Sequence, residues 1–247
     1  MTVRLRALAR LVRALMHVVH GILIVLLRFQ AYDRPRRIER IEWWSRKTLR
    51  LMGIALQVEG QAATGGALMV ANHISWLDIT ALHAVCPHAR FVSKADVKHW
   101  PLLSHLADAS NTLYLERERK RDALRVVHQM AGALQGGDLI AVFPEGTTSD
   151  GHTLLAFHAN LLQAAITTGA PVQPVALRFS DQRQPISAAV EFVGATTLVQ
   201  SVWRVACGEG LTAHVCLLAP RASANAERRA LAELLRADIA ARLLRAG

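Results

Sequence analysis

From residue 55 onward, short apolar runs of strand length alternate with segments of helical periodicity, and this alternation restricts the fold more than any other feature. The runs expected to form strands are 55–59, 67–71, 90–94, 112–115, 139–143, 172–179, 190–193 and 213–218. Helices are expected near 79–85, 120–134 and 159–168 and from about residue 225 onward. Such alternation predicts an α/β fold, with a central mixed β-sheet surrounded by helices. Pro174 interrupts the 172–179 run, which predicts an edge or bulged strand there.

The first 54 residues differ in character, because nearly all the excess positive charge lies there. Twelve Arg or Lys residues and three acidic residues precede Ala55, a net charge of +9 against +10 for the whole chain. Residues 14–27 carry no formal charge. As a helix this run would extend about 21 Å, which is less than the roughly 30 Å hydrocarbon core of a bilayer. A signal peptide also has a basic start, but no small-x-small cleavage site follows here.

Residues 36–52 combine Arg and Lys with tryptophan and aliphatic side chains in one expected helix. This combination is typical of helices that lie in a membrane interface. Nucleic-acid binding is the other use of a basic segment, and the neighbouring apolar run favours the membrane. We therefore predict that residues 1–54 form membrane-associating helices, as a hairpin in one leaflet or with a single span, and that residues 55–247 form the α/β domain. The positive flanks predict the cytoplasmic face of the inner membrane.

Cysteine and histidine spacing argues against a metal centre. The three cysteines, Cys86, Cys207 and Cys216, are far apart and lack any C-x-x-C spacing. No H-E-x-x-H pattern is present among the histidines. Neither a disulfide framework nor a bound metal is expected, and buried thiols in a reducing compartment are predicted.

A histidine and a carboxylate, His73 and Asp78, lie where the 67–71 strand gives way to a helix. A neutral imidazole can take a proton from a hydroxyl, while a carboxylate orients the ring and stabilises the imidazolium that forms. The hydroxyl would then belong to a bound substrate. Ser75 and Asp78 also have the spacing of a helix capping box, so a purely structural role for the carboxylate is the alternative.

Two further loops after expected strands carry polar residues without an obvious core role, at 116–121 and 145–151. Arg117 directly follows a strand, a position that suits bidentate binding of phosphate or carboxylate, although it could also start a charged helix. Glu145 and Gly146 begin the second loop, which brings a carboxylate, a flexible turn and hydroxyls. The three loops together predict a site at one edge of the sheet.

Four sequence blocks resemble the glycerolipid acyltransferase family, which includes the bacterial 1-acylglycerol-3-phosphate acyltransferases. The blocks are Asn72-His73 with Asp78, Leu113-Tyr114-Leu115-Glu116-Arg117, Phe143-Pro144-Glu145-Gly146-Thr147 and Ala170-Pro171-Val172-Gln173-Pro174-Val175. The resemblance implies acyl transfer from a thioester, either acyl-coenzyme A or acyl-carrier protein, to the free hydroxyl of a lysolipid. It implies no metal and no organic cofactor, and it favours a membrane surface over nucleic acid as the partner.

The same resemblance implies roles for individual residues. His73 would be the general base and Asp78 its partner. The positions that serve acceptor binding in the family correspond here to Arg117, Glu145, Gly146 and Thr147.

One position departs from the family pattern, because Thr148 stands where many members have arginine. We expect lysophosphatidate as the acceptor, giving phosphatidic acid, with lyso-ornithine lipid as the alternative. A catalytically inactive membrane-surface binding protein is the alternative from another class, and the intact His73 and Asp78 argue against it. A hydrolase is disfavoured because no G-x-S-x-G nucleophile elbow is present.

Overall fold

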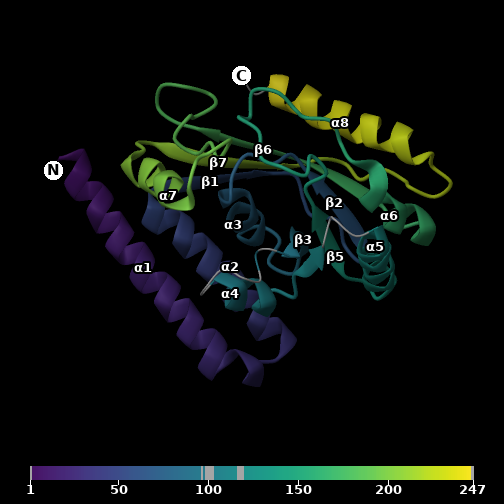
Figure 1. Cartoon of the computed structure of the whole chain (residues 1–247), viewed down its shortest axis with the longest axis horizontal. Helices are drawn as coiled ribbons and strands as arrows, with labels where there is room; N and C mark the ends of the chain where they lie inside the picture. Colours follow the sequence, from purple (N-terminus) through teal and green to yellow (C-terminus); the bar gives the residue numbers. More distant parts are fainter. Residues whose placement is uncertain (1, 96, 98–102, 116–119, 246–247) are drawn as a thin grey trace.

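The computed structural model of the chain describes residues 2–95, 97, 103–115 and 120–245. Seven strands form one sheet in the order β1-β7-β6-β2-β5-β3-β4 (Figure 1). Their bounds are β1 Ile54–Glu59, β2 Ala67–Ala71, β3 Arg90–Lys94, β4 Leu113–Leu115, β5 Leu139–Val142, β6 Val172–Ser180 and β7 Leu211–Leu217. The sheet is mixed, since β6 and β7 pair antiparallel and every other neighbouring pair is parallel. The predicted α/β fold with a mixed sheet is confirmed.

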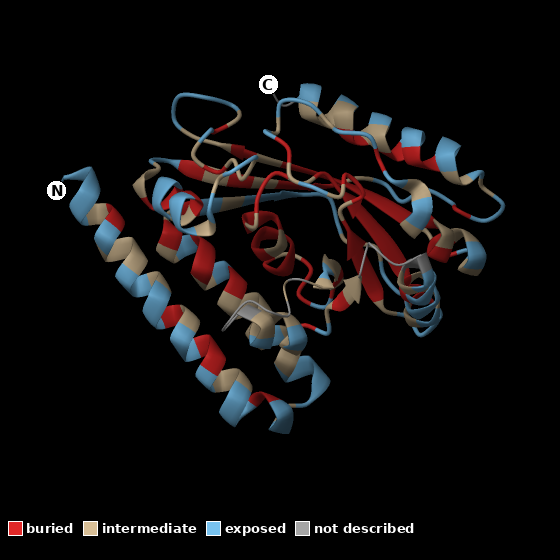
Figure 2. Ribbon diagram, viewed as in Figure 1, coloured by how far each residue is buried: buried red, intermediate tan, exposed pale blue. Residues whose placement is uncertain are grey.

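Helices cover both faces of the sheet (Figures 1 and 2). They are α1 Val3–Leu27, α2 Arg34–Met52, α3 Leu77–His83, α4 Leu103–Ala109, α5 Lys120–Gln135, α6 Gln163–Thr168, α7 Leu198–Cys207 and α8 Arg228–Leu244, with short 3₁₀ helices at Phe29–Ala31 and Ala159–Leu162. Core residues of α2, α3 and α7 pack on one face of the sheet. Those of α5, α6 and α8 pack on the other. Because β2 and β5 are buried on both faces, their sequences are continuous apolar runs.

One strand prediction is wrong and another is partly right. Residues 190–193 form no strand, although Val190 is buried. This segment is part of the connection between β6 and α7, and the carbonyl of Phe192 accepts a hydrogen bond from Thr148.

For the strand that contains Pro174, the edge alternative is wrong, because β6 has β7 on one side and β2 on the other. The bulged alternative fits, because Val172 pairs with Arg221 and Val175 with Leu217, so the facing segment has one more residue than β6 at Pro174. The Pro174 carbonyl accepts from Leu218 N–H at this bulge.

The N-terminal segment forms two long helices joined by a short turn. Helix α1 begins at Val3, well before the apolar run, so its first half includes arginines. Arg10 donates to the carbonyls of Ala206 and Gly208 at the end of α7. Helix α2 contributes Leu49 and Met52 to the core beneath the sheet. The division of the chain after residue 54 into two domains stays a prediction.

Tight packing joins α1 to α2. The His17 ring stacks on Trp44 at 5.4 Å between centroids, and His17 Nε2 lies 3.0 Å from the Trp44 carbonyl. A side chain at Gly21 would come within 2.4 Å of Trp44 Nε1, so only glycine lets the indole approach. The predicted hairpin of helices is therefore present.

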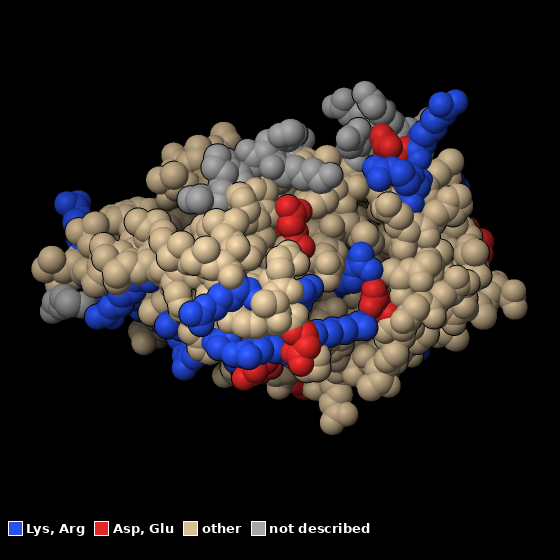
Figure 3. Space-filling model, turned by 90° about the horizontal axis from the view of Figure 1, so that it is seen from below, with Lys and Arg blue, Asp and Glu red and all other residues tan. Residues whose placement is uncertain are grey.

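The outer face of α1 is apolar and uncovered (Figure 2). Its exposed side chains are Val3, Leu5, Leu8, Val12, Leu15, Met16, Val19, Leu23, Leu26 and Leu27. Among the described helices, α1 alone has both the length and the apolar composition that a membrane crossing needs. Seen from below, Lys and Arg side chains form a band with interspersed acidic groups (Figure 3).

Candidate active site

His73 and Asp78 form the contact that the sequence predicts. They lie at the junction of β2 and α3, where Asp78 Oδ2 is 2.7 Å from His73 Nδ1. The carboxylate of Asp78 is fully buried, whereas 19% of the His73 side chain is exposed. Because a carboxylate only accepts hydrogen bonds, we assign the proton of the neutral imidazole to Nδ1. The lone pair then lies on Nε2.

Asp78 also fixes the backbone of the junction. The same oxygen, Oδ2, accepts the N–H groups of Ile74 at 2.6 Å and Ser75 at 2.9 Å. The Ser75 hydroxyl has no hydrogen-bond partner in the described part of the chain, so only half of a capping box exists. One oxygen of Asp78 thus contacts three nitrogen atoms, so the structural role of the carboxylate is present and its catalytic role stays a prediction.

Glu145 links the β2–α3 junction to the loop that follows β5. Its Oε1 accepts the His73 N–H at 2.7 Å, and its Oε2 accepts the Leu155 N–H at 2.9 Å. The side chain is buried, and burial raises the pKa of this carboxyl while the two backbone hydrogen bonds oppose that shift. Both oxygens are thus occupied by the protein's own amides.

The β5 loop holds His73 at three further points. Ser149 N–H donates to the His73 carbonyl at 2.8 Å, and the Ser149 hydroxyl lies 3.2 Å from the same oxygen. The imidazole stacks on Phe143, with ring centroids 4.1 Å apart and an angle of 14° between the planes. His73 is therefore held at its backbone N–H, its carbonyl and its ring face, which leaves little freedom for the side chain.

Asn72 anchors the end of β2 to β6. Its amide group donates to the Leu177 carbonyl at 2.9 Å, and its oxygen accepts the Leu177 N–H at 2.7 Å. The side chain is completely buried. Asn72 thus replaces a pair of backbone ladder bonds and fixes the residue immediately before the histidine.

The other predicted acceptor-binding residues have different outcomes. Gly146 is half-buried and has a left-handed backbone with φ of 73°, which glycine adopts without strain. Thr147 is exposed beside it. Arg117 lies outside the described residues. Glu145 is thus the member of this set that contacts His73 directly, through the backbone.

Thr148 makes contact with a neighbouring loop. Its hydroxyl donates to the carbonyl of Phe192, which belongs to the segment between β6 and α7. The same segment approaches the β5 loop at Gly151, where an added Cβ would lie 3.4 Å from Ile186 and 3.2 Å from Ile74. The hydroxyl at position 148 therefore supports a loop contact.

Sequence patterns placed Ser149 in a predicted site loop without a role of its own, and they did not indicate Leu155 or the stacking of Phe143 as parts of the site. Leu155 contributes a backbone N–H group, which every residue except proline possesses, so no side-chain signal marks it. Phe143 lies within a recognised block, but stacking on His73 requires β2 and β5 to be neighbours.

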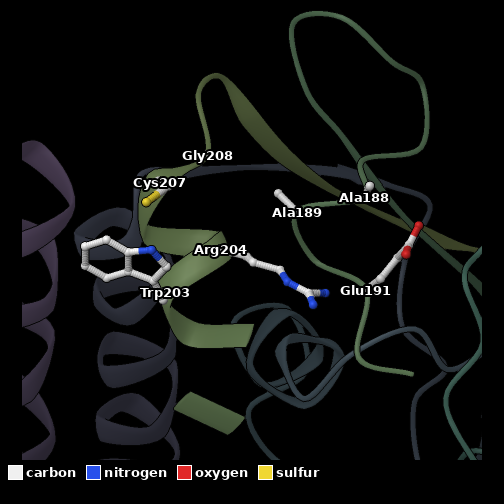
Figure 4. A pocket seen from close by; sticks show the side chains of 7 residues that line it. All are labelled: Ala188, Ala189, Glu191, Trp203, Arg204, Cys207 and Gly208. Carbon is white, nitrogen blue, oxygen red and sulfur yellow. The ribbon is translucent and has the colours of Figure 1, made fainter. Parts of the chain in front are cut away.

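An open hollow of about 580 Å³ lies away from His73, between α7 and the preceding loop (Figure 4). Arg204 points into the space toward the loop that carries Glu191, whereas Trp203 points away from that loop. Helix α7 also meets the active-site junction, because Trp76 Nε1 donates to the Ser201 hydroxyl at 3.1 Å. Of the predicted site residues that the structure describes, none lines this hollow.

Metal-ligating side chains do not gather anywhere in the described ranges, where no group of three His, Cys, Asp or Glu residues is suitably placed. The expectation that no metal and no organic cofactor takes part stays a prediction.

Comparison with known proteins gives consistent matches. The family model described as Acyltransferase matches residues 55–178. The chain is 35% identical to a lyso-ornithine lipid O-acyltransferase of Pseudomonas aeruginosa, over 80% of this chain and 76% of that protein. It is 36% identical to a 1-acyl-sn-glycerol-3-phosphate acyltransferase of Neisseria meningitidis, over 74% and 72%. The crystal structure of the 1-acyl-sn-glycerophosphate (LPA) acyltransferase from Thermotoga maritima has the same fold, with a TM-score of 0.68, 20% identity and coverage of 96% and 97%.

Proposed function

This chain belongs to the acyltransferase family, and from that premise we propose that it transfers a fatty acyl group from a thioester to the free hydroxyl of a lysolipid. The observation that carries the proposal is the buried contact between Asp78 Oδ2 and His73 Nδ1. It assigns the lone pair of the imidazole to Nε2, on a side chain that remains partly exposed. Among the residues that the structure describes, His73 Nε2 makes no hydrogen bond to a serine hydroxyl, and this fits a substrate that brings its own hydroxyl.

The reaction proceeds through proton transfers at His73. Its Nε2 takes the proton from the lysolipid hydroxyl as the oxygen attacks the thioester carbonyl. The tetrahedral intermediate then collapses, the carbon–sulfur bond breaks, and the imidazolium returns the proton to the thiolate. The charge of Asp78 stabilises the imidazolium between these two steps. Glu145 keeps the His73 backbone in place, a role that supports the base in addition to any contact with the acceptor.

Lysophosphatidate is the acceptor we propose first, with Arg117 as a ligand of its phosphate and with Gly146 and Thr147 beside it. Lyso-ornithine lipid is the second candidate, and a specific observation favours it. Thr148 stands where many relatives have arginine, and its hydroxyl is engaged by the Phe192 carbonyl. A phosphomonoester carries close to two negative charges and needs several cationic donors. A lyso-ornithine headgroup needs fewer, because it carries an amine as well as a carboxylate.

The enzyme is proposed to work at a membrane surface, on the cytoplasmic face of the inner membrane. The uncovered apolar face of α1 and the basic residues of α2 support this placement. A helix of this kind lies in the interface with its apolar side toward the acyl chains, and positive groups beside it contact anionic headgroups. The hairpin is packed against α7 and the sheet, so it would hold the catalytic edge at a fixed height above the lipid.

Purified full-length protein should be assayed with lysophosphatidate and with lyso-ornithine lipid, each with acyl-coenzyme A and with acyl-carrier protein as donor. We expect a two-chain product with at least one donor, and a higher kcat/KM for lysophosphatidate. Faster acylation of lyso-ornithine lipid would select the second candidate. Absence of product from every lysolipid, in a protein that is folded and bound to vesicles, would contradict the proposed reaction and favour an inactive binding protein.

A further inference from the structure

Helix α8 forms side-chain hydrogen bonds to the active-site loop through Arg236. Its Nε donates to the Leu155 carbonyl at 3.0 Å, and its NH2 group donates to the Leu154 carbonyl at 2.8 Å. The planar guanidinium therefore holds two successive carbonyls at once. Helix α8 is itself fixed, because Leu235 and Ile239 are fully buried in the core on that face of the sheet.

The contact continues from Leu155 to the base. The Leu155 N–H donates to Glu145 Oε2, while Glu145 Oε1 accepts the His73 N–H. We propose that Arg236 is a positioning residue for the acyl transfer: it fixes the peptide of Leu155, which orients Glu145, which holds the backbone of His73. The inference rests on the proposed function, since it assigns a role in that reaction to a helix outside the matched family region, residues 55–178.

The segment before the 159–162 turn needs such support. Residues 154–158 form neither helix nor strand, and 38% of Leu155 is exposed. The bond from His158 N–H to the Pro144 carbonyl, 2.8 Å long, and the buried side chain of Phe157 hold the end of this segment. At Leu155 itself, the Arg236 bond to the carbonyl is the contact that restrains the residue whose N–H donates to Glu145 at the start of the segment.

A buried carboxylate that loses one of its two donors is poorly satisfied and tends to reorient. Reorientation of Glu145 would release the His73 N–H as well, because both oxygens belong to one rigid group. The imidazole would then be less accurately placed relative to the substrate hydroxyl. A misplacement of about 1 Å lowers the rate by about 100-fold in well-organised sites.

The first test compares Arg236→Ala with Arg236→Lys and with two control variants. Arg229→Ala removes an exposed arginine from the first turn of the same helix. Arg221→Ala removes the two-bond ion pair with Asp238, and so loosens α8 without touching residues 154–155. We expect Arg236→Ala to lower kcat by about 10- to 100-fold with KM nearly unchanged, and Arg236→Lys to recover part of the loss. Both controls should keep the wild-type kcat.

A double-mutant cycle with Glu145→Gln separates positioning from a general loss of stability. Both oxygens of Glu145 accept N–H groups, and an amide can accept at only one of its two ends. If Arg236 acts through Glu145, adding Arg236→Ala to Glu145→Gln should change kcat by less than about threefold. Independent, multiplying effects would overturn the inference, as would a wild-type kcat in Arg236→Ala.

Amide hydrogen exchange gives a readout that does not depend on activity. Peptides that cover 72–78 and 145–158 should exchange faster in Arg236→Ala than in wild type or in Arg229→Ala, with other core peptides unchanged. Unchanged exchange in both peptides would refute the inference even if no lysolipid were acylated. Failure of the wild-type enzyme with every lysolipid would instead refute the proposed function, so the two failures can be told apart.

Discussion

Replacing Asp78 by asparagine tests how much the buried charge contributes to catalysis. The amide oxygen of the Asp78→Asn variant should take the place of Oδ2, because the N–H groups of Ile74 and Ser75 both need an acceptor there. His73 Nδ1 then keeps a neutral hydrogen bond, but the imidazolium formed during the reaction loses its counter-charge. The main effect is therefore on the transition state, with smaller effects on substrate binding.

The magnitude follows from the separation of the two groups. At the observed contact, unit charges interact by about 4 to 6 kcal/mol at an effective dielectric constant of about 20. The amide dipole keeps part of this stabilisation. We therefore expect a loss of about 3 to 4 kcal/mol, which is about 10²- to 10³-fold in kcat. Folding stability should fall by about 1 to 3 kcal/mol, because the new NH₂ group lies where Oδ1 is buried without a described partner.

The assay measures kcat and KM with vesicle-presented lysolipid at a temperature well below the melting transition of both proteins. Thermal melts run in parallel give the unfolded fraction at that temperature. Asp150→Asn, the same change at an exposed carboxylate of the β5 loop, is the matched control and should keep wild-type kinetics. A kcat that falls only in proportion to the unfolded fraction would show that Asp78 acts solely as a backbone cap.

Three further predictions concern the Glu145 carboxyl, membrane binding and the acceptor. Because burial raises the pKa of Glu145 above its usual 4.5, wild-type stability should gain as the pH falls through that raised pKa toward 4.5; Glu145→Gln has no carboxyl to protonate, so the difference in stability between the two, measured by denaturant unfolding, should shift in favour of the wild type over this range. The double variant Leu15→Asp, Val19→Asp places two charges on the exposed face of α1 and should weaken vesicle binding by at least about 100-fold. High salt alone should not release the wild-type protein from vesicles, and complete release by salt would contradict apolar insertion. Arg117→Ala should raise the KM for lysophosphatidate far more than the KM for the acyl donor, and equal changes in both would exclude Arg117 as an acceptor ligand.

Local sequence was sufficient for the central strands and for the histidine–carboxylate pair. Strands β2 and β5 are covered on both faces, so their runs of apolar residues are continuous and unambiguous. His73 and Asp78 lie within one short connection, and their contact depends on few residues. The loop around Val190 has the same apolar pattern as a strand because Val190 is buried, but the backbone N–H of Val190 forms its hydrogen bond within the loop and not with a strand of the sheet. Burial alone therefore does not identify a strand.

Contacts between distant segments could not be predicted from the residues. Glu145 meets the His73 N–H only because β2 and β5 are neighbours in the sheet, and Leu155 and Arg236 add contacts from still further along the chain. Backbone amides supply most of the donors involved, and they leave no trace in the identity of the side chain. Pro174 likewise predicted an edge or a bulge, and the choice between them required the neighbouring strand, which the local sequence does not show.

The most direct test of the proposed chemistry is the acyl-transfer rate of His73→Ala, measured with saturating lysolipid and acyl donor. Removal of the general base should lower kcat by at least about 10³-fold, while the melting temperature and vesicle binding stay close to those of wild type because the His73 N–H and carbonyl contacts belong to the backbone. A folded, vesicle-bound His73→Ala protein that retains more than about one tenth of the wild-type kcat would contradict a mechanism in which His73 takes the proton from the acceptor hydroxyl.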